Sequence, residues 1–176
     1  MKLETTWKTF DEAVALLSKA PPLPCRELKS GGYRCDADWT VDTGLITLDD
    51  EGRPFGSRIY SPFGNQLLVE HKPDGKLTMK AGYWWDGCSF IVIDRKTNMR
   101  AGGLHDEGYH LCRSGDWDAS VMRKPLDTLF RAFYKVDGGW GWIGWIDYAG
   151  LRVGASSAAA RQQESESKLL SFGVKK

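Results

Sequence analysis

Several side chains in this sequence are of the types that carry out acid–base or metal chemistry. Four of them are Asp86, His105, Asp106 and Asp127, and the hydroxyl of Ser89 closely follows the first. Three carboxylates and an imidazole can bind a divalent metal ion and activate a water molecule. Alternatively, His105 can act as a general base that an aspartate orients. One interpretation is therefore a catalytic cleft with Ser89 near its rim.

The same side chains also fit a hydrogen-bond network without catalytic activity. Burying a polar group costs a few kcal/mol unless it is paired, so these residues need partners. In this interpretation His105 donates to Asp86 or to a loop carbonyl, Asp106 caps a helix or forms a salt bridge, and Asp127 closes a helix end. Arg123 pairs with Asp106 or Asp127. The expected network consists of Asp86, Ser89, His105, Asp106, Tyr109, Arg123 and Asp127.

The spacing of apolar residues predicts a helix over 98–112, with Thr97 or Asn98 as its N-cap. His105 falls on the apolar stripe of this helix, and Asp106 lies about 100° around the axis. A histidine on an apolar helix face is usually a hydrogen-bonded core residue, which favours the structural interpretation. The glycines at 102, 103 and 108 lower helix propensity and indicate close approach of another backbone, for which we expect the loop at Asp86-Gly87.

A second helix is predicted to begin near Pro125, because proline suits the first helical position, and to end at Gly138-Gly139. This start places Asp127 in the first turn, where the helix dipole favours a carboxylate. A third helix is predicted from about 142 to beyond 153. These helices would pack together and carry most of the polar residues.

The elements before these helices are expected to be one N-terminal helix and a small antiparallel sheet. Thr9 and Glu12 have the spacing of a capping box, and Pro21-Pro22 ends the helix that follows. Short β-type segments then occupy 33–82, with Pro73-Asp74-Gly75 as a turn between two of them. Nearby prolines place 57–60 at a sheet edge or in a loop. The predicted fold class is α+β.

The chain has 176 residues, enough for one domain with a real core. We expect an N-terminal helix and connector over 1–32, an α+β domain over 33–154 and a polar tail over 155–176. Near the end of this tail stand Leu169, Leu170 and Phe172, an apolar group that could bind a partner protein.

Composition argues against several functional classes. The formal net charge is +1, from 24 basic and 23 acidic residues, which gives no electrostatic reason to expect nucleic acid as a partner. No apolar run approaches the roughly 20 residues needed to span a bilayer. The 4 cysteines lack the paired spacing of zinc sites. We expect reduced thiols, with one disulfide left open, and no cofactor unless the catalytic interpretation brings a divalent metal.

The polar motifs resemble a phage-associated family known as domain of unknown function thirteen fifty-three. Its pattern is similar to GxxxDGxS, LHDxxY and RxxxDxxF followed by a closing helix with YxxxRxxG character. The matching positions are Gly82, Asp86, Gly87, Ser89, Leu104, His105, Asp106, Tyr109, Arg123, Asp127, Phe130, Tyr148, Arg152 and Gly154. The family usually has a proline soon after the serine, where this chain has Phe90-Ile91. The resemblance covers about 77–154 and implies an α+β fold and a phage origin, without an established activity.

These observations lead to three functional expectations. The favoured one is a tailed-bacteriophage protein that serves as an accessory structural or interaction component of the virion, in its head, neck or tail, and has no catalytic activity. Its partners would be other phage proteins or copies of itself, in the virion or the host cytoplasm. The alternatives are a metal-dependent hydrolase acting on the host envelope or a phosphoester, and a small inhibitor of a host factor.

Overall fold

The computed structural model describes residues 1–29, 31–62, 64–85 and 99–139. Strands precede two long helices, and a short helix lies near the N-terminus, so the α+β prediction is confirmed. The elements are β1 (Lys2–Thr5), α1 (Phe10–Leu17), β2 (Cys25–Glu27), β3 (Tyr33–Cys35), β4 (Trp39–Asp42), β5 (Leu45–Leu48), β6 (Ser57–Tyr60), β7 (Leu67–His71), β8 (Lys76–Met79), β9 (Trp84–Trp85), α2 (Met99–Arg113) and α3 (Ala119–Val136).

The largest sheet is antiparallel and has the strand order β4-β8-β7-β6. Its tight connection between β7 and β8 is the predicted Pro73-Asp74-Gly75 turn, in which Gly75 has a φ of +83°. Such a positive φ is readily adopted only by glycine. Strand β6 is an edge strand, as the flanking prolines indicated.

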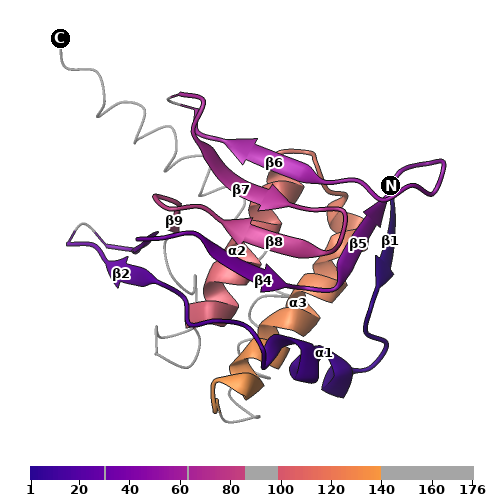
Figure 1. The fold of residues 1–176 in the computed structure, drawn as a ribbon, viewed down its shortest axis with the longest axis horizontal. Coiled ribbons are helices and arrows are strands. Elements are labelled where there is room, and N and C mark those ends of the chain that lie inside the picture. Colours follow the sequence, from indigo (N-terminus) through magenta and orange to yellow (C-terminus); the bar gives the residue numbers. More distant parts are fainter. Residues whose placement is uncertain (30, 63, 86–98, 140–176) are drawn as a thin grey trace.

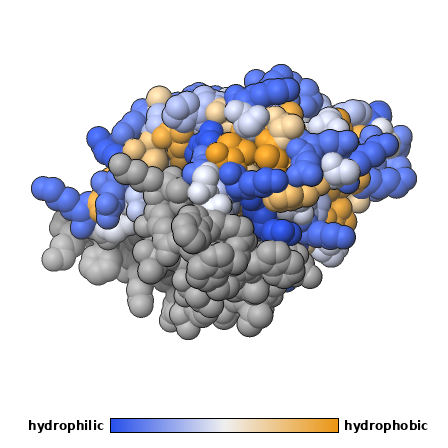
Figure 2. Space-filling model, turned by 90° about the horizontal axis from the view of Figure 1, so that it is seen from below, coloured by the Kyte–Doolittle hydropathy of each residue, from blue (hydrophilic) through white to orange (hydrophobic). Residues whose placement is uncertain are grey.

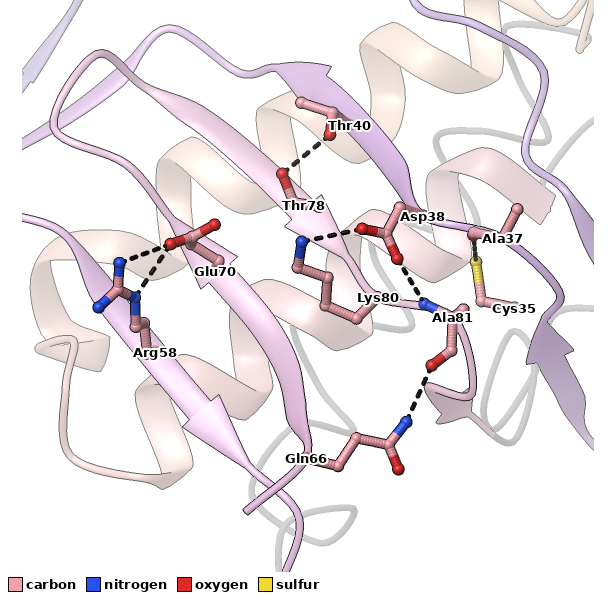
Figure 3. A network of polar contacts seen from close by, with 10 residues as sticks. All are labelled: Cys35, Ala37, Asp38, Thr40, Arg58, Gln66, Glu70, Thr78, Lys80 and Ala81. Atoms are coloured by element: carbon pink, nitrogen blue, oxygen red, sulfur yellow. Dashed lines mark hydrogen bonds and ion pairs between the residues drawn. The ribbon is translucent and has the colours of Figure 1, made fainter.

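One face of this sheet carries paired polar side chains (Figure 3). Arg58 of β6 forms an ion pair with Glu70 of β7 at 2.8 Å, and the hydroxyls of Thr40 and Thr78 lie 2.9 Å apart across β4 and β8. Lys80 donates to Asp38 at 2.8 Å. Alternate residues of β4 and β6 are buried, so the other face of the sheet carries the apolar side chains.

Helices α2 and α3 lie behind this sheet in the view of Figure 1 and pack against its apolar face. Trp39 of β4 contacts Phe133 of α3, with ring centroids 5.9 Å apart. A Cβ placed on Gly103 of α2 would lie 3.3 Å from Met79 of β8. Figure 2 shows a second view, in which a group of apolar residues is visible on the face seen from below, with hydrophilic residues above and beside it.

The N-terminal segment shares sheets with the later part of the chain. Strand β1, which the sequence pattern did not predict, pairs antiparallel with β5, and β2 joins β3 and β9 in a three-stranded sheet. The capping box of α1 is confirmed, because Thr9 accepts from the Glu12 backbone and Glu12 accepts from the Thr9 backbone. Helix α1 packs on α3, where Arg131 lies over the Phe10 ring.

The predicted start of the second long helix is wrong. Helix α3 begins at Ala119, because Asp118 caps it by accepting from the Ser120 backbone at 2.8 Å, and Pro125 lies inside the helix. The end at Gly138 is confirmed: Asp137 is the C-cap and Gly138 follows with a φ of +79°. The 98–112 helix is observed as α2, whereas its predicted N-cap and the helix from about 142 lie outside the described residues.

Among the described residues, no helix is long and apolar enough to cross a membrane. The Arg100 side chain of α2 binds Asp137, the C-cap residue of α3, and donates to the Ala20 carbonyl at 2.9 Å. It thereby joins both long helices to the segment after α1.

Candidate functional site

The centre of the candidate site is a buried pair between the two long helices. Nε2 of His105 in α2 lies 3.1 Å from Oδ1 of Asp127 in α3. The side chain of Asp127 is fully buried and that of His105 is 6% exposed. Because a carboxylate only accepts, Nε2 carries the proton in this bond, and the imidazole ring is held in one orientation.

A tyrosine is a second donor to the same carboxylate oxygen. The Tyr109 hydroxyl donates to Oδ1 of Asp127 at 3.2 Å, and its ring stacks on the His105 ring with centroids 4.2 Å apart. His105 and Tyr109 are four residues apart and therefore lie on one side of α2. Phe130 of α3 contacts the His105 ring edge-on, with centroids 5.5 Å apart. The imidazole is thus packed between two aromatic rings.

The close packing of α2 on α3 brings these groups within hydrogen-bond distance. The helices can approach this closely because residue 108 is a glycine. A Cβ at this position would lie 2.3 Å from a Cδ of Leu126, a separation that real Cβ atoms essentially never show. We expected the glycines of this helix to meet the loop at Asp86-Gly87. For Gly108 the observed neighbour is instead Leu126, one residue before Asp127 in α3.

The electrostatics around the cluster favour a tyrosine that stays protonated. Burial raises the pKa of Tyr109, and the negative charge of Asp127 raises it further. Arg123 acts in the opposite direction and lowers the pKa of Tyr109, which places its guanidinium close to this hydroxyl. Tyr109 is therefore a permanent hydrogen-bond donor to Asp127 at neutral pH.

The structure corrects one expectation about Asp127 and gives His105 a partner that was not expected. Asp127 does not lie in the first turn of its helix, since α3 begins eight positions earlier at Ala119, and so the helix dipole does not explain the carboxylate. Its position is explained by the donors His105 and Tyr109. The partner of His105 Nε2 is Asp127, and the expected contact of His105 with Asp86 lies outside the described residues.

Other predicted site residues are only partly placed. Asp106 is half-buried on α2, and Arg123 is half-buried on α3 near Tyr109. Several further predicted positions lie outside the described residues: Asp86, Ser89, Leu169, Leu170 and Phe172. Within 1–29, 31–62, 64–85 and 99–139, no group of three or more His, Cys, Asp or Glu side chains could hold a metal ion. A metal site that includes Asp86 stays a prediction.

One fully buried acid was not predicted from the sequence. Glu107 of α2 is 0% exposed, and neither of its carboxyl oxygens has a hydrogen-bond partner within the described part of the chain. Burial raises the pKa of this carboxyl well above its ordinary value, because a low-dielectric interior disfavours the charged form. The signal in the sequence is local: Gly103, Leu104 and Leu111, which lie one helical turn from Glu107, are small or apolar.

Comparison with known proteins gives no relative for this chain: no family model, no curated protein and no solved structure matches it.

Proposed function

We propose that this chain is a tailed-bacteriophage protein that acts as an accessory structural or interaction component of the virion, without catalytic activity. The observation that carries the proposal is the buried pair between His105 and Asp127. Both side chains are used to join α2 to α3, and aromatic rings cover the imidazole. Such a network fixes how two helices pack and needs no substrate.

Access is the main argument against a catalytic role for this pair. A general base must come within hydrogen-bond reach of the proton that it removes. Asp127 is fully buried, and only 6% of the His105 side chain is exposed. The bond to Asp127 uses Nε2 of His105, which leaves Nδ1 as the nitrogen that could accept a proton, on a side chain that is almost fully buried. Within the described residues, His105, Tyr109 and Asp127 are therefore hydrogen-bond partners that stabilise the packing of α2 on α3.

The proposed phage origin is supported by the order of the LHDxxY and RxxxDxxF motifs, which resembles that of the phage-associated family. In the structure these motifs supply residues that contact one another. The LHDxxY segment supplies His105 and Tyr109 from α2, and the RxxxDxxF segment supplies Asp127 and Phe130 from α3. These four residues contact one another. The two motifs thus describe the two halves of one helix-packing site.

A role in assembly needs surface that another protein can bind. Large apolar side chains are exposed at Tyr60 of the edge strand β6, at 52%, and at Trp84 of β9, at 39%. Apolar residues also gather on the face shown in Figure 2. Other phage proteins or further copies of this chain are the proposed partners, since aromatic residues are enriched in protein interfaces.

A metal-dependent hydrolase is the second candidate, and the histidine–aspartate pair is the observation that favours it. In this alternative Asp127 orients His105, and Asp86 contributes a metal ligand. The substrate would be the host envelope or a phosphoester. A hydrolase needs His105 for turnover, whereas the structural proposal needs it for stability, and variants of this residue separate the two.

Quantitative mass spectrometry of purified virions tests the proposed function. The virions are purified from the host strain that carries the gene for this chain. The copy number of the chain is measured relative to that of the major capsid protein. We expect a constant number of copies per particle that survives density-gradient purification. A non-structural phage protein from the same infected cells serves as the contamination control. Detection in the infected cells together with absence from the particles would refute a virion role and favour the hydrolase or an inhibitor of a host factor.

A further inference from the structure

Two cysteines face each other across the hairpin formed by β2 and β3. Cys25 and Cys35 are direct partners in the antiparallel register. The Asp36 amide donates to the Pro24 carbonyl at 2.7 Å, immediately outside this pair. In an antiparallel ladder, a bond in that place identifies a non-hydrogen-bonded pair. At such a pair the two Cα atoms are about 4.5 Å apart and both side chains lie on one face.

This arrangement meets the geometric requirement for a disulfide. Bridged cysteines have Cα atoms about 4.4–6.8 Å apart, and a non-hydrogen-bonded pair falls within that range. In the structure both thiols are free. The thiol of Cys35 donates to the Ala37 carbonyl at 3.0 Å (Figure 3). A rotation about the Cα–Cβ bond would turn this sulfur from the carbonyl toward Cys25.

The two thiols differ in their access to solvent. Cys35 is 1% exposed, in the central strand of its sheet, whereas Cys25 is half-buried on the outer strand β2. Burial raises the pKa of Cys25, and it raises that of Cys35 to about 11. The charge of Cys25 also raises the pKa of Cys35, which is consistent with a short distance between the two side chains. A reagent in solution therefore meets Cys25 first.

We propose that Cys25 and Cys35 form a thiol–disulfide exchange site, which accepts small disulfides of the glutathione class and closes into an intramolecular disulfide. The Cys25 thiolate attacks one sulfur of the oxidant, and the first glutathione leaves as a thiolate that takes up a proton. The Cys35 sulfur then loses its proton and attacks Sγ of Cys25, and the second glutathione leaves. Two protein thiols are oxidised and one disulfide of the oxidant is reduced to two thiols.

The closed disulfide would join β2 covalently to β3. It would also remove the hydrogen bond that the Ala37 carbonyl now receives from Cys35. Strand β3 pairs with β9 on its other side, so the bond would tie the outer strand of this sheet to its centre. The exchange site is independent of the His105 cluster and of the proposed virion role.

The experiment uses the full chain, purified under reducing conditions and then exposed to oxidised glutathione at mildly alkaline pH, where more thiolate is present. After unfolding, free thiols are alkylated and counted by mass spectrometry, and peptide mapping identifies the linkage. We expect the chain to lose two of its 4 alkylatable thiols, with Cys25 linked to Cys35, and to regain them after treatment with a dithiol reductant. Retention of both thiols, or a linkage from either of them to another cysteine, would overturn the proposal.

Single substitutions separate the two steps. Cys35→Ser removes the resolving thiol, so the reaction is expected to stop at a glutathione adduct on Cys25. Cys25→Ser is expected to leave Cys35 unmodified, because that thiol is almost fully buried. Cys112 is the matched control: it is half-buried, and burial raises its pKa to about 11, like that of Cys35. Equal oxidation of Cys112 would show that exchange is not specific to the hairpin pair and would also contradict the proposal.

Discussion

His105 and Asp127 are 22 positions apart in the sequence, and a hydrogen bond of 3.1 Å joins them across the interface between α2 and α3. Asp127 is fully buried, so removing a donor leaves a carboxylate that water cannot easily solvate. The interface is therefore sensitive to any change that removes a donor or alters the separation of the two helices. Tyr109→Phe and His105→Ala each remove a donor, and Gly108→Ala changes the separation of the helices.

The Tyr109 hydroxyl is the second donor to Asp127, at 3.2 Å. Tyr109→Phe removes this hydroxyl, with its contacts to Asp127 and Arg123, and keeps the ring that stacks on His105. We expect the free energy of unfolding to fall by about 1–2 kcal/mol, measured by urea titration. Tyr60→Phe is the matched control, because Tyr60 is 52% exposed, and its effect should stay within about 0.5 kcal/mol. Equal effects of both variants would show that the Tyr109 bond does not stabilise the interface.

Gly108 sets the separation of the helices, since a Cβ there would lie 2.3 Å from Leu126. Gly108→Ala is expected to destabilise the protein by about 1–3 kcal/mol through overpacking, even though alanine favours helices by about 1 kcal/mol. The measurement is again the free energy of unfolding in urea.

The background Leu126→Ala provides the control for this steric argument. Leu126 is 1% exposed, so its truncation leaves space beside Gly108. In that background Gly108→Ala should cost nothing or stabilise the protein, because the clash is absent and the helix propensity of alanine remains. The same loss in both backgrounds would rule out Leu126 as the cause.

Glu107 gives a prediction about pH. Burial raises the pKa of this carboxyl well above its ordinary value of 4.5, so the folded protein holds a proton that the unfolded chain releases. The contribution of Glu107 to stability is therefore full below pH 4.5 and is lost as the pH rises toward the folded-state pKa. The glutamine of Glu107→Gln cannot ionise, so this variant should not lose that stability as the pH rises.

The test of this prediction is the difference in unfolding free energy between the wild type and Glu107→Gln across a pH series. The difference should move in favour of the variant as the pH rises above 4.5, by up to about 1.4 kcal/mol per pH unit. Glu4→Gln serves as the control, because Glu4 lies on the outer strand β1. A difference that does not change with pH would mean that Glu107 ionises as easily in the folded protein as in the unfolded chain.

Local patterns in the sequence predicted most elements of the fold. The capping box at Thr9, the turn at Pro73-Asp74-Gly75 and the edge position of β6 all depend on residues close together in the chain. The start of α3 was predicted wrongly because Pro125 was taken as its first residue. Asp118 provides the stronger start signal, since its side chain accepts from the Ser120 amide and the helix continues through the proline.

The candidate site was predicted only in part, because its pairing is not local. The sequence identified His105, Tyr109 and Asp127 as polar residues that need partners, but helical spacing does not say which helix faces which. The pairing depends on the packing of α2 on α3. The burial of Glu107 was not predicted for a related reason. Helix α2 is buried on more than one side, whereas the apolar stripe in its sequence indicates only one buried side.

The most direct test of the structural role of His105 is the stability of His105→Ala. The substitution removes a donor to buried Asp127 and the ring between Tyr109 and Phe130, so we predict a loss of about 2–4 kcal/mol in urea unfolding. A double-mutant cycle with Asp127→Ala should show coupling between the two residues. A His105→Ala variant with wild-type stability that has lost activity in a hydrolysis or lysis assay would contradict the structural role and establish the catalytic one.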